Sequence, residues 1–235
     1  MKLKRTMIMT ALAGMLLASC VRENVEPESY DRFYLNPPKF CGDSKLTFDH
    51  NGLWWVGGDM ICINGKDHEL FNENGVWHTE GEPVESVNGK FYVGISPAEW
   101  DESALRYGPY NFVDDQIIPL AIAGTTNRLT LWPCCAVIRS TQYHELILED
   151  IWSGAVARSG YVYPGESLAS CRIVTGEDPF GPGESLYPIV GEDGAYYFVL
   201  PIIGNEDFEA ILTFDWDVTT LDAVVIKKGY FYDLG

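Results

Sequence analysis

The chain has 235 residues, with 16 Lys and Arg against 34 Asp and Glu, so its formal net charge is −18. This acidity argues against a nucleic-acid partner, because binding to phosphates requires clustered basic side chains. Hydrophobic residues make up 46%, which excludes a disordered polypeptide, and 23 Gly with 13 Pro favour many short strands joined by turns over a helical bundle.

The first twenty residues have the form of an export signal. A basic start at 2–5 precedes an apolar run at 7–18, which is shorter than the roughly 20 apolar residues needed to span a bilayer. The run ends in the sequence LASC at 17–20, which resembles the lipobox of bacterial lipoproteins. The resemblance implies that residues 1–19 are removed and that Cys20 is acylated and anchors the protein to a membrane. The alternative is an ordinary signal peptide with an incidental cysteine.

Residues 20–40 are expected to form a lipidated tether. The segment is polar, contains Pro27 and two adjacent prolines at 37–38, and has no sustained apolar period, so an extended linker is the simplest interpretation. It also contains Arg22 and Arg32, whose accessible backbone would offer two sites to a trypsin-like protease.

Strand signals recur about every 8–12 residues along the remainder of the chain, which is the pattern of a β-sandwich. In residues 207–215 apolar and more polar residues alternate, as expected for a strand with one buried face. A boundary after residue 139 would divide the body into a first β-sandwich at 41–139 and a second at 140–235. Strands are expected at 46–48, 61–63, 91–95, 117–122, 128–132, 135–139, 144–148, 195–200, 207–215, 223–226 and 230–232.

One short helix is expected after the strand at 91–95. Ser96 would be its N-cap, Pro97 would take the first helical position, and Glu99 would complete a capping box. The helix would have to end before the Gly-Pro pair at 108–109.

Chemistry-bearing motifs are missing from the sequence, so we expect no enzyme and no catalytic, cofactor-binding or metal-binding residue. Beyond Cys20 there are five cysteines, and this odd number leaves at least one thiol unpaired in a monomer. Cys134 and Cys135 are adjacent and should point to opposite faces of a strand. A hydrolase based on two carboxylates is the minor alternative, because carboxylate pairs are common in so acidic a chain. The five cysteines are Cys41, Cys62, Cys134, Cys135 and Cys171.

Residues 54–65 (WWVGGDMICING) resemble the W-x-x-G-D-x-I-x-[IV] element of fimbrillin-like surface lipoproteins of Gram-negative anaerobes. The residues of this structural motif are Trp54, Gly58, Asp59 and Ile61. Ile61 would lie in the core, Asp59 would bond backbone amides beside a glycine turn, and Trp54 or its neighbour would cover the end of the strand. Three further similar segments follow in the family's order, at 91–97 (FYVGISP), 119–138 and 195–201 (AYYFVLP).

The resemblance implies an all-β fold of two tandem transthyretin-like antiparallel β-sandwich domains. It also implies an outer-membrane, cell-surface precursor that a protease cuts after Arg22 or Arg32, so that a strand from a neighbouring subunit can fill the groove left behind. The expected function is then a non-catalytic fimbrial subunit, minor tip protein or anchor. Its partners would be the membrane through Cys20, itself or other fimbrial subunits, and host or glycan ligands in cell adhesion. The alternative is a glycan-binding surface lipoprotein, suggested by the seven Trp.

Overall fold

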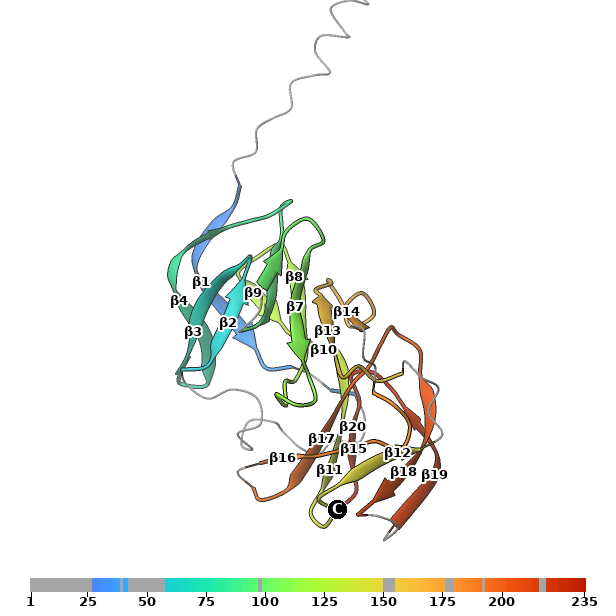
Figure 1. Ribbon diagram of the computed structural model, residues 1–235. Coiled ribbons are helices and arrows are strands. Elements are labelled where there is room, and N and C mark those ends of the chain that lie inside the picture. Colours follow the sequence, from blue (N-terminus) through green and yellow to red (C-terminus); the bar gives the residue numbers. More distant parts are fainter. Residues whose placement is uncertain are drawn as a thin grey trace, which may run out of the picture.

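The computed structural model describes residues 27–38, 40–41, 58–96, 99–149, 155–175, 180–191, 193–215 and 219–235. Throughout these ranges the chain is all-β, as its turn-rich composition predicts, and its strands form four sheets. Figure 1 shows two lobes, of which the second holds most of the C-terminal strands. The strand expected at 46–48 lies outside the described residues.

The largest sheet forms the frame of the first lobe. Its strands are β1 (Ser29–Asn36), β2 (Met60–Ile63), β3 (Lys66–Glu73), β4 (Val76–Glu85), β5 (Phe91–Ile95), β8 (Leu120–Gly124), β9 (Arg128–Thr130) and β10 (Trp132–Pro133). Their order is β10-β8-β5-β2-β3-β4-β1-β9. Only Leu131 separates β9 from β10, so the first and last strands of this order are consecutive in the chain. The sheet therefore closes on itself. We call it the rolled sheet.

The inside of the rolled sheet is a continuous apolar core. It is built from every second residue of the strands, because successive side chains of a strand point to opposite faces. Its fully buried or nearly buried members are Phe33, Leu35, Ile61, Ile63, Leu70, Val84, Phe91, Val93, Leu120, Ile122, Leu129 and Leu131.

A second sheet covers part of the outside of the rolled sheet. Its strands are β6 (Glu99–Asp101), β7 (Arg106–Asn111), β13 (Ser159–Tyr163) and β14 (Arg172–Thr175), in the order β14-β13-β7-β6. Tyr107 packs against the outward face of β5, where a Cβ added to Gly94 would lie 2.6 Å from the Tyr107 ring. The glycine therefore sets how closely the two sheets approach. Because β13 pairs with β7, hydrogen bonds link residues on either side of the boundary at 139, which stays a prediction.

The short helix expected from Ser96 is not found in the described residues, and residues 99–101 form strand β6 instead. Trp100 pairs across the sheet with Tyr107, and their ring centroids lie 4.6 Å apart. The Asp101 carboxylate accepts the N–H groups of Ser103 and Ala104, at 3.1 and 3.3 Å, and so closes a turn into β7. Such a local side-chain bond favours a turn over a helix, and the contact between the two rings holds the strand in place. Residues 97–98 lie outside the described part.

The second lobe is a β-sandwich of two four-stranded sheets. One contains β11 (Cys135–Ser140), β16 (Ile189–Val190), β17 (Tyr196–Pro201) and β20 (Phe231–Asp233), in the order β16-β17-β11-β20. The other contains β12 (Leu146–Glu149), β15 (Ser185–Leu186), β18 (Phe208–Phe214) and β19 (Thr219–Ile226), in the order β15-β12-β18-β19. Alternate residues of both sheets meet in one buried core, which includes Ile138, Leu148, Phe198, Leu200, Leu212 and Phe214.

Candidate functional site

Strand β1 lies between β4 and β9 in the rolled sheet, where Figure 1 draws it in blue. It runs antiparallel to β4, with pairs from Ser29 to Leu35, and parallel to β9, with pairs from Tyr34 to Asn36. Its backbone therefore satisfies hydrogen-bonding groups on two neighbours. Removal of β1 would leave open strand edges on both sides of the gap, and such edges readily accept another strand.

The inward face of β1 fills the apolar core. Phe33 is 0% exposed and Leu35 is 3% exposed. The ring of Phe33 meets the ring of Phe91 edge-on, with the centroids 5.1 Å apart, and Tyr30 lies 5.3 Å from the same ring. Loss of β1 would thus uncover an apolar floor between the two open edges.

The outward face of β1 is polar. Arg32 forms an ion pair with Glu80 of β4, and both side chains are substantially exposed. The Arg128 guanidinium lies 4.6 Å from the centroid of the Tyr34 ring. The strand therefore has one apolar and one polar face, which is the pattern of a strand that fits a groove in one orientation only.

The structure differs from the expectation of a simple tether at residues 29–36. The signal that could have found β1 is the alternation around Phe33 and Leu35, in which inward apolar residues are flanked by Arg32 and Tyr34. The run has only two deeply buried residues, and the prolines on either side favoured the linker interpretation.

Arg32, one of the two expected cleavage sites, lies in the middle of β1. Its carbonyl accepts a hydrogen bond of 2.9 Å from the Asn127 side chain, and the N–H of Phe33 donates to the Thr79 hydroxyl over 3.3 Å. Both sides of the Arg32–Phe33 peptide bond are thus engaged in the sheet. A protease can reach this bond only after β1 has left its neighbours locally. Arg22 and Cys20, the expected lipidation site, lie outside the described residues.

The element that carries the family resemblance begins β2, which β3 and β4 separate from β1. Gly58 has a φ of +101° and donates its N–H to the carbonyl of Leu70 over 3.0 Å. Asp59 is exposed, and its carbonyl accepts the Leu70 N–H over 2.8 Å. Ile61 is fully buried inside the rolled sheet. The element therefore lies apart from the cleavage candidate, and its Trp54 is outside the described residues.

An open cavity of about 830 Å³ lies where the turn after β13 meets the rolled sheet. Its basic residues already have partners within the chain. Lys90 forms an ion pair with Glu166, and the Arg172 guanidinium lies 4.7 Å from the centroid of the Tyr163 ring. These contacts show a structural role for the basic residues of the cavity, because they hold the turn after β13 against the rolled sheet.

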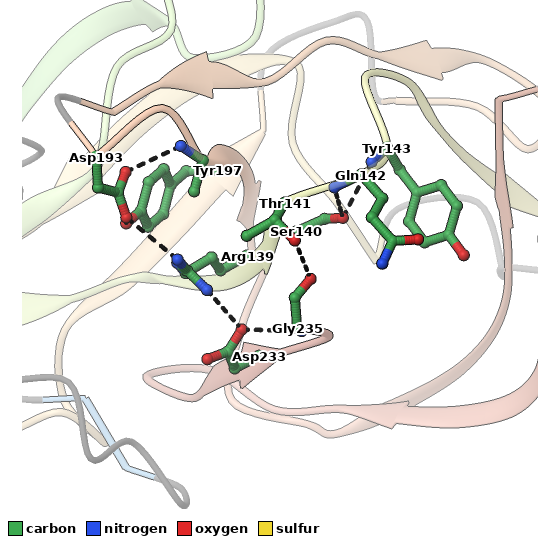
Figure 2. Close-up of polar contacts among 10 residues, drawn as sticks. Arg139, Ser140, Thr141, Gln142, Tyr143, Asp193, Tyr197, Asp233 and Gly235 are labelled. Atoms are coloured by element: carbon green, nitrogen blue, oxygen red, sulfur yellow. Dashed lines mark hydrogen bonds and ion pairs between the residues drawn. The ribbon is translucent and has the colours of Figure 1, made fainter.

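Figure 2 shows the Arg139 side chain between two carboxylates. Its guanidinium donates to Asp233 over 3.0 Å and to Asp193 over 3.3 Å. Burial acts to raise the pKa of the Asp193 carboxyl, but hydrogen bonds from the Ala195 N–H, the Tyr197 hydroxyl and Arg139 outweigh it and hold that pKa below its usual value. The carboxylates therefore tie β11, β17 and β20 together instead of facing each other, as the acid and base of a hydrolase would.

Other features of the described part bear on the expected partners. Of the seven Trp, the three described ones at 77, 100 and 132 are half-buried and do not form an exposed stacking platform. Within the described ranges, no group of three or more metal-ligating side chains gathers to hold an ion. No helix in this part of the chain has the length and apolar character to cross a membrane.

No protein-family model matches the chain, and no curated protein matches it either. The features that bear on its function are therefore β1, the groove that it fills and the N-terminal sequence.

Proposed function

We propose that this protein is a non-catalytic, fimbrillin-like surface lipoprotein that assembles by strand donation, as a fimbrial subunit, a minor tip protein or an anchor. The observation that carries the proposal is the position of β1, which is paired on both sides and contributes Phe33 and Leu35 to the core. When such a strand leaves, it exposes unpaired backbone and apolar surface together. A strand from a neighbouring subunit relieves both costs at once.

In this proposal the two lobes correspond to the two transthyretin-like domains, residues 1–19 are removed on export, and lipid on Cys20 holds the precursor at the outer membrane. The two candidate cuts have different consequences. A cut after Arg22 separates the lipid from an intact β1. A cut after Arg32 divides β1, so the half that carries Phe33 and Leu35 is held by a shorter ladder and is displaced more easily by a strand from a neighbouring subunit.

The experiment is limited trypsin digestion of the purified precursor, followed by electrophoresis without boiling and by mass spectrometry of the new N-termini. We expect a ladder of SDS-resistant oligomers whose subunits begin after Arg22 or after Arg32. The matched variants are Arg22→Gln, Arg32→Gln and the double variant, and the double variant should remain monomeric. Complete cleavage at both sites with a monomeric product would show that strand exchange is wrong.

A synthetic peptide that covers residues 27–38 provides an independent test. Because it carries the whole of β1, it should occupy the groove of cleaved subunits and suppress the ladder when it is present in excess. A peptide with Phe33 and Leu35 both replaced by Ser is the control, since it keeps the backbone but loses the apolar face. Equal suppression by both peptides would contradict a specific groove.

A further inference from the structure

Two buried cysteines from distant parts of the sequence lie against the same stretch of chain. Cys134 follows β10, and its N–H donates to the carbonyl of Pro119 over 2.8 Å. Cys171 precedes β14, and its Sγ donates to the carbonyl of Ala121 over 3.5 Å. Both cysteines are 0% exposed, and both belong to the apolar cluster between the rolled sheet and the second sheet.

Neighbouring strands link the two cysteines a second time. The N–H of Ile202 donates to the carbonyl of Cys134 over 3.0 Å. The next residue, Ile203, forms a parallel β-bridge with Ile173, two residues after Cys171. The backbone at the end of β17 thus runs past both cysteines.

Lys228 and Gly229, just before β20, provide a third link. Lys228 is 8% exposed, and its Nζ donates to the carbonyl of Cys171 over 2.7 Å and to the side chain of Asn205. The N–H of Gly229 donates to the carbonyl of Cys135 over 2.7 Å. Three sets of contacts therefore place Cys134 and Cys171 against the same three chain segments.

The two thiols contact each other. The hydrogen bond between them, together with burial, raises the pKa of the Cys134 thiol, and the same bond lowers the pKa of Cys171. The Gly165 N–H donates to the Cys171 sulfur over 3.1 Å and also favours its thiolate. Two thiols that the fold holds in contact are placed to be joined by a disulfide bond.

We propose that Cys134 and Cys171 are a disulfide site, which an external disulfide oxidises while the chain folds. The Cys171 thiolate attacks one sulfur of the donor disulfide, so the donor S–S bond breaks and a mixed disulfide forms. Cys134 then loses its proton and attacks the Cys171 sulfur, which forms the bond within the protein and releases the second donor thiol. Two electrons and two protons pass to the donor, which leaves as two thiols. Because both sulfurs are buried in the folded chain, exchange precedes closure of the second sheet.

The remaining described cysteines differ from this pair in position or in surroundings. Cys135 lies on the opposite face of its strand, in a separate cluster with Val137 and Tyr197. Cys62 belongs to the same apolar cluster as the pair, but burial and the neighbouring Asp67 raise the pKa of its thiol to about 12. Cys41 is exposed and lies beside Tyr230, in the second lobe. An odd number of cysteines is thus compatible with one internal bond.

The test is to unfold the full chain, refold it in a mixture of oxidised and reduced glutathione, block free thiols by alkylation and map tryptic peptides without reduction. We expect peptide 129–139 to be linked to peptide 159–172. Because peptide 129–139 contains both Cys134 and Cys135, the Cys135→Ala variant is required, and it should retain the link. Cys134→Ala and Cys171→Ala should lose it.

The outcomes are distinct even if one of these variants does not fold. Wild-type chain with all its thiols alkylated overturns the proposal, and so does a link that persists in Cys134→Ala or disappears in Cys135→Ala. Thermal unfolding gives a second readout. A bond between Cys134 and Cys171 closes the loop between them, and closing a loop of this length raises the thermal midpoint by on the order of 5–10 °C. Reductant should remove that increment from the wild type and from Cys135→Ala, and an unchanged midpoint would also contradict the bond.

Discussion

The substitution Phe33→Ala tests whether β1 is held mainly by its apolar face. Phe33 is fully buried and packs against the ring of Phe91, with centroids 5.1 Å apart, and against Tyr30, at 6.0 Å. Truncation of a buried Phe to Ala costs about 3–5 kcal/mol, because the lost transfer free energy is added to the cost of a cavity. The closed ladder around β1 restricts collapse of the sheet into that cavity, so we expect a value in the upper half of this range.

The assay is urea unfolding of wild type and variant, combined with hydrogen exchange of the β1 amides. Arg32→Ala is the matched control on the same strand, since its ion pair with Glu80 is exposed and surface pairs of this kind contribute little to stability. Phe33→Ala should also form oligomers faster after trypsin cleavage, because β1 leaves more readily. If Phe33→Ala costs under 1 kcal/mol, or no more than Arg32→Ala, the apolar face does not hold the strand.

Three further predictions concern the sheets around β1. Gly94→Ala should lower the free energy of unfolding by about 1–3 kcal/mol, since the added methyl would meet the Tyr107 ring at 2.6 Å; an unchanged thermal midpoint would show that the two sheets separate easily. Burial lowers the pKa of His68, so the folded chain binds its proton less readily than the unfolded chain, and stability should fall as pH drops below about 6.5. His68→Leu should flatten this decline in pH-dependent urea titrations, and an equally steep decline in the variant would show that His68 is not its cause. Glu80→Gln should have little effect on the free energy of unfolding, and the small difference from wild type should vanish in high salt; a large, salt-independent loss would mean that this pair is not a surface contact.

The strands that the sequence predicts best are those with dense apolar or aromatic runs. The expected strand at 91–95 coincides with β5, and those at 135–139 and 207–215 agree with β11 and β18 to within one residue at each end. In each, several consecutive or alternate residues are buried, so composition and period agree. Patterns of this kind also fix the all-β class.

Strands β3 and β4 could not be predicted in the same way, because they are mostly polar. Their inward faces hold few deeply buried side chains, among them Leu70, Val84 and His68. They form strands because they pair with each other and with their neighbours β2 and β1 in the sheet. The capping residues near Ser96 predicted a helix for a related reason, since local sequence does not reveal that Trp100 pairs with Tyr107 across a sheet.

The sequence predicts Arg32 as a cleavage site, but it does not predict the strand that contains Arg32. A protease site in a linker and a protease site in a paired strand have the same local residues, and only the partners of Phe33 and Leu35 distinguish them. The neighbouring cysteines 134 and 171 are likewise separated in sequence and meet only in the fold.

The pairing of β1 with both β4 and β9 has a mechanical consequence for an anchored molecule. Hydrogen bonds between strands run across the strand direction, so tension applied through the chain that precedes Pro27 loads all the bonds of β1 together, in shear. Bonds loaded in parallel resist force far better than bonds opened one after another. In the proposed strand exchange β1 has to depart, and the same strand would hold firmly against a pull along its axis, whereas a peeling force would release it easily.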